Sequence, residues 1–107
     1  MLRRKLKLTK EDKEWANAVK DRDGRACVIC GARERLNAHH IIVRENNETK
    51  LDIENGLSLC PKHHFFCRKI SAHNNPIGLL VWLEKHKPEQ FYNIKKKMES
   101  ILDDYFR

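Results

Sequence analysis

The chain of 107 residues contains no long apolar run. A membrane-spanning helix needs about 20 consecutive apolar residues, and no segment approaches that length. The N-terminal stretch, residues 1–8, is strongly basic, and its few apolar residues do not form the apolar centre of a signal peptide. We therefore expect a protein that does not enter a membrane and that works in the reducing environment of the cytoplasm.

Glycine and proline are also scarce, at 4 and 3 residues. No segment rich in Gly, Ser or Pro separates one half of the chain from the other, and no internal repeat is visible. The composition therefore predicts one domain spanning residues 1–107, with a basic tail at 1–8. A domain of this length buries only a modest core, so we expect an additional source of stability.

Four cysteines are candidates for that source. In a reducing compartment, spaced Cys and His residues are more often zinc ligands than disulfide partners. A first Cys-x-x-Cys pair, followed by a glycine, has the spacing of a zinc knuckle, although a redox Cys-x-x-Cys has the same spacing. A Cys-x-x-His segment thirty residues later raises the ligand count to four. We predict a structural zinc site formed by Cys27, Cys30, Cys60 and His63.

Another cysteine follows shortly after His63. Cys67 lies four residues later, which would place it on the same face of a helix. Cys67 is therefore an alternative to His63 as the fourth zinc ligand, and the spacing favours His63.

The order of elements around the cysteines is predicted to be strand, loop, strand, helix. Residues 36–42 form a short strand with β-branched residues at its end, and 57–59 form a second strand. The charged segment 43–54 is a loop, and Pro61 begins a short helix at 62–69. Adjacent helical residues point about 100 degrees apart, so one helix can direct His63 to the thiolates and His64 to the strands.

The remaining ends of the chain are predicted to be helical. Thr9 and Asp12 form a capping box for a helix that Asp23-Gly24 ends, and this helix places Trp15 and Val19 over the metal-bound centre. Two further helices occupy residues 76–106, with Asn75 as a cap and prolines at both starts. The last helix has an apolar stripe that we expect in the core, made of Phe91, Ile94, Met98, Ile101, Leu102 and Tyr105.

Lys and Arg exceed Asp and Glu by 22 to 15, giving a formal net charge of +7. A polyanion such as nucleic acid is the natural partner of this excess, although a merely soluble surface also explains it. The lysines at 95–97 are expected to form a solvated face or, alternatively, to extend a nucleic-acid track.

Five histidines lie outside the predicted zinc site, and the four besides His64 require separate interpretations. His39 and His40 are neighbours on a predicted strand and therefore point to opposite faces. For both to act on one substrate, the strand must end, twist or bulge there. His73 is expected at the surface, and His86 at a helix end with no chemical role.

An ordered set of motifs resembles the HNH endonuclease family, whose fold is the ββα-metal fold. The set covers some forty residues and consists of Cys27-x-x-Cys30, Ala38-His39-His40-Ile41, Asn55-Gly56-Leu57-Ser58-Leu59 and Cys60-Pro61-Lys62-His63-His64. The resemblance implies an α+β fold with a zinc-pinned ββα core at 27–69. An N-terminal helix and two C-terminal helices would flank this core.

The resemblance also implies roles for individual residues. His40 matches the general base that takes a proton from the attacking water, and Asn55 matches a positioning residue. His39 and His64 match ligands of one catalytic divalent cation such as Mg²⁺, Mn²⁺ or Ni²⁺. Many family members have a carboxylate where this chain has His39, and others have a further His where it has Arg68. Arg68 is expected to hold phosphate, together with Arg44 and Lys69.

The function implied is metal-dependent hydrolysis of DNA phosphodiester bonds, as a nick or a double-strand break. Nucleases of this kind occur with phage, restriction and mobile-element proteins, which suggests the cytoplasm of a bacterium or of a phage-infected host, and a monomer or a homodimer. The alternative is a non-catalytic, zinc-stabilised nucleic-acid-binding module, which needs the zinc ligands and basic surface but makes no demand on His40 or Asn55. A zinc-stabilised protein adaptor would leave the charge excess without a purpose.

Overall fold

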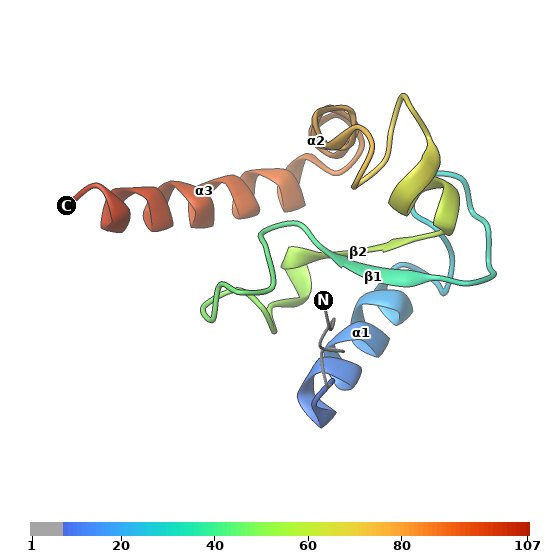
Figure 1. Cartoon of the computed structure of the whole chain (residues 1–107), viewed down its shortest axis with the longest axis horizontal. Helices are drawn as coiled ribbons and strands as arrows, with labels where there is room; N and C mark the ends of the chain where they lie inside the picture. The colour runs from blue at the N-terminus through green and yellow to red at the C-terminus, as the bar shows by residue number, and fades with distance from the viewer. Residues whose placement is uncertain (1–7) are drawn as a thin grey trace, which may run out of the picture.

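A computed structural model describes residues 8–107, and most of the basic tail expected at 1–8 lies outside this range. Figure 1 shows a two-stranded sheet with helices on both sides. The elements in chain order are α1 (Lys10–Arg22), β1 (Asn37–His40), η1 (Ile53–Asn55), β2 (Gly56–Leu59), η2 (Lys62–Phe66), α2 (Pro76–His86) and α3 (Pro88–Tyr105). No helix in the described part of the chain is both long enough and apolar enough to span a membrane.

Helix α1 begins where the capping box predicts. The Thr9 side chain accepts a hydrogen bond from the backbone of Asp12, and the Asp12 carboxylate accepts one from the backbone of Thr9, at 3.1 Å and 2.9 Å. These two bonds satisfy N–H groups that the first helical turn leaves unpaired. The helix buries Trp15 and Val19 against the strands, on the face of the sheet opposite η2 (Figure 1), whereas the prediction placed these side chains over the metal-bound centre.

The strands β1 and β2 pair antiparallel, with His39 opposite Leu57 and His40 opposite Gly56. Helix α1 lies on one side of the pair, and η2 and α2 lie on the other (Figure 1). Gly56 is required because a Cβ atom there would lie 2.5 Å from a Val19 methyl and 2.8 Å from the Trp15 ring. The close approach brings α1 directly onto the end of the sheet that carries His40.

The helix after β2 is shorter than predicted. The expected helix at 62–69 ends at Phe66, and its final backbone bond runs from the Cys67 N–H to the Lys62 carbonyl, five residues back, at 2.7 Å. This spacing makes η2 a single π-helical turn, a form that is frequent at functional sites. Cys67 is extended and half-buried, so the prediction that it shares a helical face with His63 is wrong.

The two C-terminal helices have the predicted starts, with Asn75 capping α2 and a proline in the first turn of each. In α2 the buried residues are Leu79 and Leu83, whereas the apolar side chains at 77, 80 and 81 are exposed.

In α3 the apolar stripe is mostly uncovered. Only Ile94 is buried, and Leu102 and Tyr105 are exposed, so the expectation that the whole stripe forms core is wrong. Polar contacts hold the helix to η1 instead. Gln90 donates to the Glu54 and Gly56 carbonyls, Asn93 donates to the Glu54 carboxylate, and Lys97 pairs with Asp52.

The resulting fold is a small antiparallel sheet with helices, in the predicted order of strand, loop, strand, helix. The core lies between β2, α2 and the first cysteine knuckle, where Leu57, Leu59 and Leu83 are fully buried. The α+β fold class with a ββα centre is thereby confirmed. Two clusters of side chains that are able to bind metal lie against this sheet.

Candidate metal centres and active site

The first cluster consists of three thiols and one imidazole. One ligand atom from each of Cys27, Cys30, Cys60 and His63 lies within 4.8 Å of all the others. The Cys30 and Cys60 sulfurs are 3.7 Å apart, and the His63 Nδ1 is 3.5 Å and 3.8 Å from the Cys60 and Cys27 sulfurs. Cys67 is not in this cluster.

These separations suit a zinc ion. Zn–S bonds of about 2.3 Å and Zn–N bonds of about 2.0 Å in a tetrahedron put two sulfurs about 3.8 Å apart and a sulfur and a nitrogen about 3.5 Å apart. The four donors also have the chemistry of a structural zinc site, three thiols and one imidazole. The Cys₃His cluster is therefore compatible with zinc.

Backbone hydrogen bonds fix the first knuckle to the sheet. The Gly31 N–H donates to the Cys27 carbonyl at 2.9 Å, and Gly31 has a φ of 79 degrees, a left-handed conformation that favours glycine. The Val28 N–H donates to the Ser58 carbonyl of β2 at 3.0 Å. The knuckle thus extends the sheet edge and meets Cys60, the residue that directly follows β2.

The second cluster consists of three imidazoles. Ring nitrogens of His39, His64 and His73 lie within 4.8 Å of one another, and the two Nε2 atoms of His64 and His73 are 3.3 Å apart. Two nitrogens bound to one tetrahedral ion at about 2.0 Å are about 3.3 Å apart. The family resemblance implied that His39 and His64 bind one cation, and the structure brings them together. His73, which was expected only at the surface, joins them.

A chain reversal after η2 positions His73. The His73 N–H donates to the His64 carbonyl and the Ala72 N–H donates to the His63 carbonyl, both at 3.0 Å. The buried Ser71 hydroxyl stabilises the next turn by accepting from the backbone of Asn74 and Asn75. His73 is exposed, as predicted for a surface residue, yet the backbone pairing holds its ring at the cluster.

The two half-buried histidines of this cluster favour the neutral form. Burial, together with the charges of neighbouring imidazoles, lowers the pKa of His39 and of His64 to about 4. A neutral imidazole is the form that binds a cation. The Nδ1 of His64 is buried and has no hydrogen-bond partner in the described structure, so this nitrogen is free to interact with a further group. The three residues therefore fit a divalent cation.

His40 lies on the opposite face of β1, as strand geometry requires, and the strand ends at this residue. Its ring stacks on the Trp15 indole at a centroid distance of 3.8 Å and an interplanar angle of 8 degrees. The Nε2 is 2.9 Å from the Lys50 carbonyl. A carbonyl only accepts, so Nε2 carries the proton and Nδ1 is the nitrogen able to accept one in the neutral ring. Burial lowers the pKa of His40, which favours that neutral form.

Asn55 is fully buried and ties together the loop that follows His40. Its side-chain oxygen accepts from the Ile42 N–H at 2.6 Å, and its amide nitrogen donates to the Ile42 and Thr49 carbonyls at 2.9 Å and 3.2 Å. Thr49 precedes Lys50, whose carbonyl faces His40. The amide thus closes the loop whose backbone contacts the His40 ring.

We expect Asn55→Ala to lower the free energy of unfolding by about 2–4 kcal/mol, because it leaves buried backbone groups at Ile42 and Thr49 without partners. Urea denaturation followed by circular dichroism measures this loss. Asn47→Ala is the matched control, since Asn47 lies in the same loop and is exposed, and its effect should stay within about 0.5 kcal/mol. Equal stability of the two variants would contradict the bracing role.

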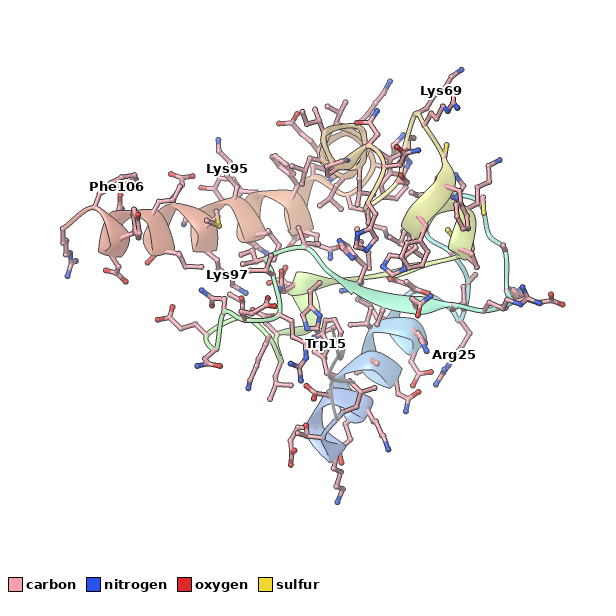
Figure 2. The ribbon with its side chains drawn as sticks, viewed as in Figure 1. Trp15, Arg25, Lys69, Lys95, Lys97 and Phe106 are labelled. Atoms are coloured by element: carbon pink, nitrogen blue, oxygen red, sulfur yellow. The ribbon has the colours of Figure 1, made fainter. Side chains whose placement is uncertain are left out.

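The cationic side chains near the clusters differ in their pairing. Arg68 and Lys69 are exposed on the segment after η2, and Figure 2 shows Lys69 at the outer edge of the molecule. Arg44 is half-buried and donates to the Asp12 carboxylate at 2.6 Å, so its charge is matched. That contact and the Thr9 backbone N–H hold the pKa of Asp12 at about 2.

The lysine run of α3 is divided between two roles. Lys97 points toward η1 and pairs with Asp52, whereas Lys95 is exposed on the other side of the helix (Figure 2). The prediction of one solvated lysine face is therefore wrong for Lys97. The cause is tertiary, since carboxylates on the loop before β2 meet this helix face.

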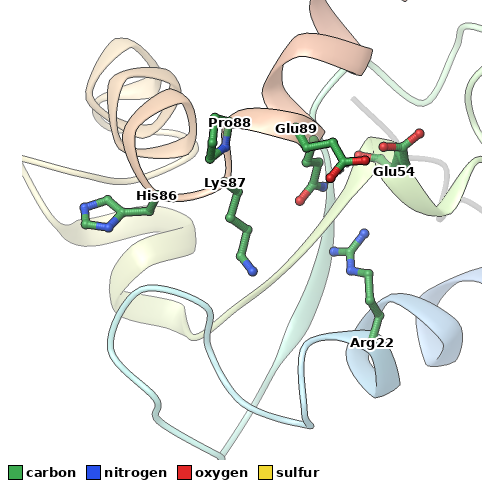
Figure 3. Close-up of a pocket in the computed structure, with 7 residues that line it drawn as sticks. Arg22, Glu54, His86, Lys87, Pro88 and Glu89 are labelled. Carbon is green, nitrogen blue, oxygen red and sulfur yellow. Dashed lines mark hydrogen bonds between the residues drawn. The ribbon is translucent and has the colours of Figure 1, made fainter.

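A cavity of about 450 Å³, shown in Figure 3, has no residue of either metal-type cluster in its lining. It opens between the end of α1, η1 and the junction of α2 with α3, and both acidic and basic side chains line it. Its Arg22 guanidinium donates to Asp23 and to the carbonyls of Ile53 and Gly56. The arginine thus joins α1 to η1 and β2, and we give the cavity no chemical role.

A ββα unit with a Cys₃His cluster on one side and a three-histidine cluster beside it defines a class of small domains whose side chains are able to bind metal. In a comparison with protein families, residues 27–66 match the model described as HNH endonuclease. The resemblance seen in the motifs is confirmed for this segment. Searches of the curated proteins and of the solved structures found no match.

Proposed function

We propose that the chain, as one domain spanning residues 1–107, is a divalent-metal-dependent endonuclease that hydrolyses phosphodiester bonds of DNA. The observation that supports this most directly is the pair of imidazole environments at the end of β1. His39 belongs to the three-histidine cluster. The next residue, His40, stacks on Trp15 and has one nitrogen able to accept a proton. A phosphodiester at this strand end would have a cation-binding cluster on one side and a base on the other.

In this proposal His40 is the general base. Its Nδ1 takes the proton of the attacking water, while Nε2 keeps its hydrogen bond to the Lys50 carbonyl, which stabilises the charge that the ring gains. The flat stack on Trp15 fixes the plane of the ring. Asn55 is a positioning residue, because it holds the loop that carries the Lys50 carbonyl.

The three-histidine cluster would hold the catalytic cation, with His73 added to the family pair His39 and His64. When bound, a divalent cation would neutralise the negative charge that develops on the phosphate and on the leaving oxygen. An all-imidazole donor set favours Mn²⁺, Ni²⁺ or Zn²⁺ over Mg²⁺, which prefers oxygen ligands. The Cys₃His cluster would hold a structural Zn²⁺, and neither its three thiols nor His63 would take part in the chemistry.

Contacts to the DNA backbone are assigned to the exposed Arg68 and Lys69, which follow the helix that carries His64. Arg44 contributes less to binding in this proposal, because Asp12 matches its charge. Each phosphate contact adds to the salt dependence of binding, so affinity should fall steeply as salt rises. A monomer would nick one strand, and a dimer would cut both.

A plasmid assay tests the proposal. We expect the full chain to relax or linearise supercoiled plasmid when Mn²⁺ or Ni²⁺ is added, more slowly with Mg²⁺, and not at all in a chelator that strips the three-histidine cluster. Binding of plasmid without conversion in any of these metals would favour the non-catalytic nucleic-acid-binding module instead. Absence of both binding and conversion would contradict both functions.

A further inference from the structure

An aromatic row leads outward from the three-histidine cluster and ends in an exposed ring. The Phe65 ring stacks on His73 at a centroid distance of 4.9 Å and an angle of 14 degrees, and it contacts the His64 ring at 4.1 Å. The Phe66 ring lies 5.9 Å beyond Phe65. Phe65 is 43 % exposed and Phe66 is 70 % exposed, so the row becomes more accessible with distance from the cluster.

The backbone presents the Phe66 ring from a fixed turn. Phe66 is the last residue of η2, and the bond from the Cys67 N–H to the Lys62 carbonyl closes that turn. The Asn74 amide donates to the Phe66 carbonyl at 3.2 Å. Both hydrogen bonds hold the backbone that carries the exposed ring, next in sequence to Phe65, which contacts the cluster.

Exposed basic residues flank Phe66 in the sequence. Lys62, Arg68 and Lys69 are exposed on η2 and on the segment directly after it. The backbone of Arg68 and Lys69 is also held, since both carbonyls accept hydrogen bonds from the Asn75 amide at 3.0 Å and 3.1 Å. An exposed aromatic ring among cations is the combination with which proteins hold single-stranded nucleic acid, stacking a base while the cations follow the backbone.

We propose that Phe66 is a stacking platform for an unpaired nucleobase next to the phosphate held at the three-histidine cluster. This inference rests on the proposed function and adds to it a substrate class, DNA that is single-stranded or locally unpaired at the cleavage position. The two ring-to-ring steps from His73 to Phe66 are 4.9 Å and 5.9 Å, and successive bases of one strand are about 3.4 Å apart. The stacked base therefore belongs to a nucleotide within a few positions of the scissile phosphate.

The test measures binding of the full-length, zinc-containing protein to a short fluorescein-labelled oligonucleotide, either single-stranded or as a blunt duplex. Fluorescence anisotropy gives the affinities, and no catalytic metal is added, so that the DNA stays intact. We expect Phe66→Ala to weaken single-strand binding by about 5- to 150-fold, the loss of one base–aromatic stack. Duplex binding should change less than about twofold, because paired bases are already stacked within the helix.

Three further variants separate stacking from other causes. Phe66→Trp should retain the wild-type affinity for the single strand, whereas Phe66→Leu, which is apolar but lacks a π face, should lose it as the alanine variant does. Phe106→Ala should have no effect, although Phe106 is 76 % exposed, because it lies at the far end of α3 (Figure 2). The exposure of both side chains means that truncation leaves the fold intact, which circular dichroism verifies.

Two results would overturn the stacking role. One is a Phe66→Ala variant that binds the single strand within about twofold of wild type, and the other is full affinity in the leucine variant. Either result leaves the nuclease proposal standing if the wild type still converts plasmid. A wild-type protein that neither binds nor converts DNA refutes the proposed function itself.

Discussion

Cys27→Ser is expected to lose the zinc of the Cys₃His cluster and to unfold. Cys27 is buried between β2 and α2 and belongs to both the cluster and the hydrophobic core. Structural zinc contributes about 10–16 kcal/mol in small sites, whereas a whole domain is stable by about 5–15 kcal/mol. A serine hydroxyl stays protonated at neutral pH and does not replace the thiolate, so the loss of this ligand exceeds what the small core supplies.

Cobalt substitution measures this loss at the correct site. Thiolates bound to Co²⁺ give a sulfur-to-metal charge-transfer absorption, which a site made only of imidazoles lacks, so the two clusters are distinguished. We expect the absorption in wild type and its loss in Cys27→Ser, together with loss of the cooperative thermal transition in circular dichroism. Retention of both signals in Cys27→Ser would contradict a structural role for the cluster.

Cys67→Ser is the matched control. Cys67 lies just after η2, four residues from His63, but outside the cluster. The control should keep the cobalt absorption and the wild-type melting temperature, while His63→Ala should reduce both. If instead Cys67→Ser loses the absorption and His63→Ala keeps it, Cys67 is the fourth ligand and the assignment of His63 is wrong.

Those parts of the fold that depend on neighbours in sequence were predictable. The capping box at Thr9 and Asp12, the proline starts of α2 and α3 and the Cys-x-x-Cys turn with its left-handed Gly31 are all set by contacts within a few residues. Local geometry decides such features before any tertiary contact forms. The side chains of His39 and His40 point to opposite faces of the sheet, and this likewise follows from the two-residue period of a strand.

Those parts that depend on distant contacts were not predictable. His73 reaches His64 only because η2 closes with a bond across five residues and the chain then reverses, and no periodic pattern encodes that turn. The apolar stripe of α3 predicts a buried face only if another element covers it. Part of the contact between α3 and the domain is polar instead. Gln90, Asn93 and Lys97 contact the η1 segment, where Glu54 and Asp52 are their partners.

His40→Ala is expected to slow plasmid conversion by about 10²- to 10⁴-fold, the usual contribution of a positioned general base. The measurement is the rate of conversion at saturating Mn²⁺, with retained fold checked by circular dichroism. His86→Ala is the control, because His86 is also a histidine stacked on a tryptophan, with its ring 5.1 Å from that of Trp82. His86 is exposed at the end of α2, and its removal should leave the rate unchanged.

The conservative variant His40→Gln separates a base from a positioning residue. Glutamine retains an N–H donor of the kind that the Lys50 carbonyl accepts, but its amide is too weakly basic to take a proton from water. If His40 is the base, His40→Gln should be as slow as His40→Ala, while both keep the cobalt spectrum of the three-histidine cluster. A glutamine variant that cuts at the wild-type rate would show that the ring only braces the loop, and the proton acceptor would then have to be sought elsewhere at the end of β1.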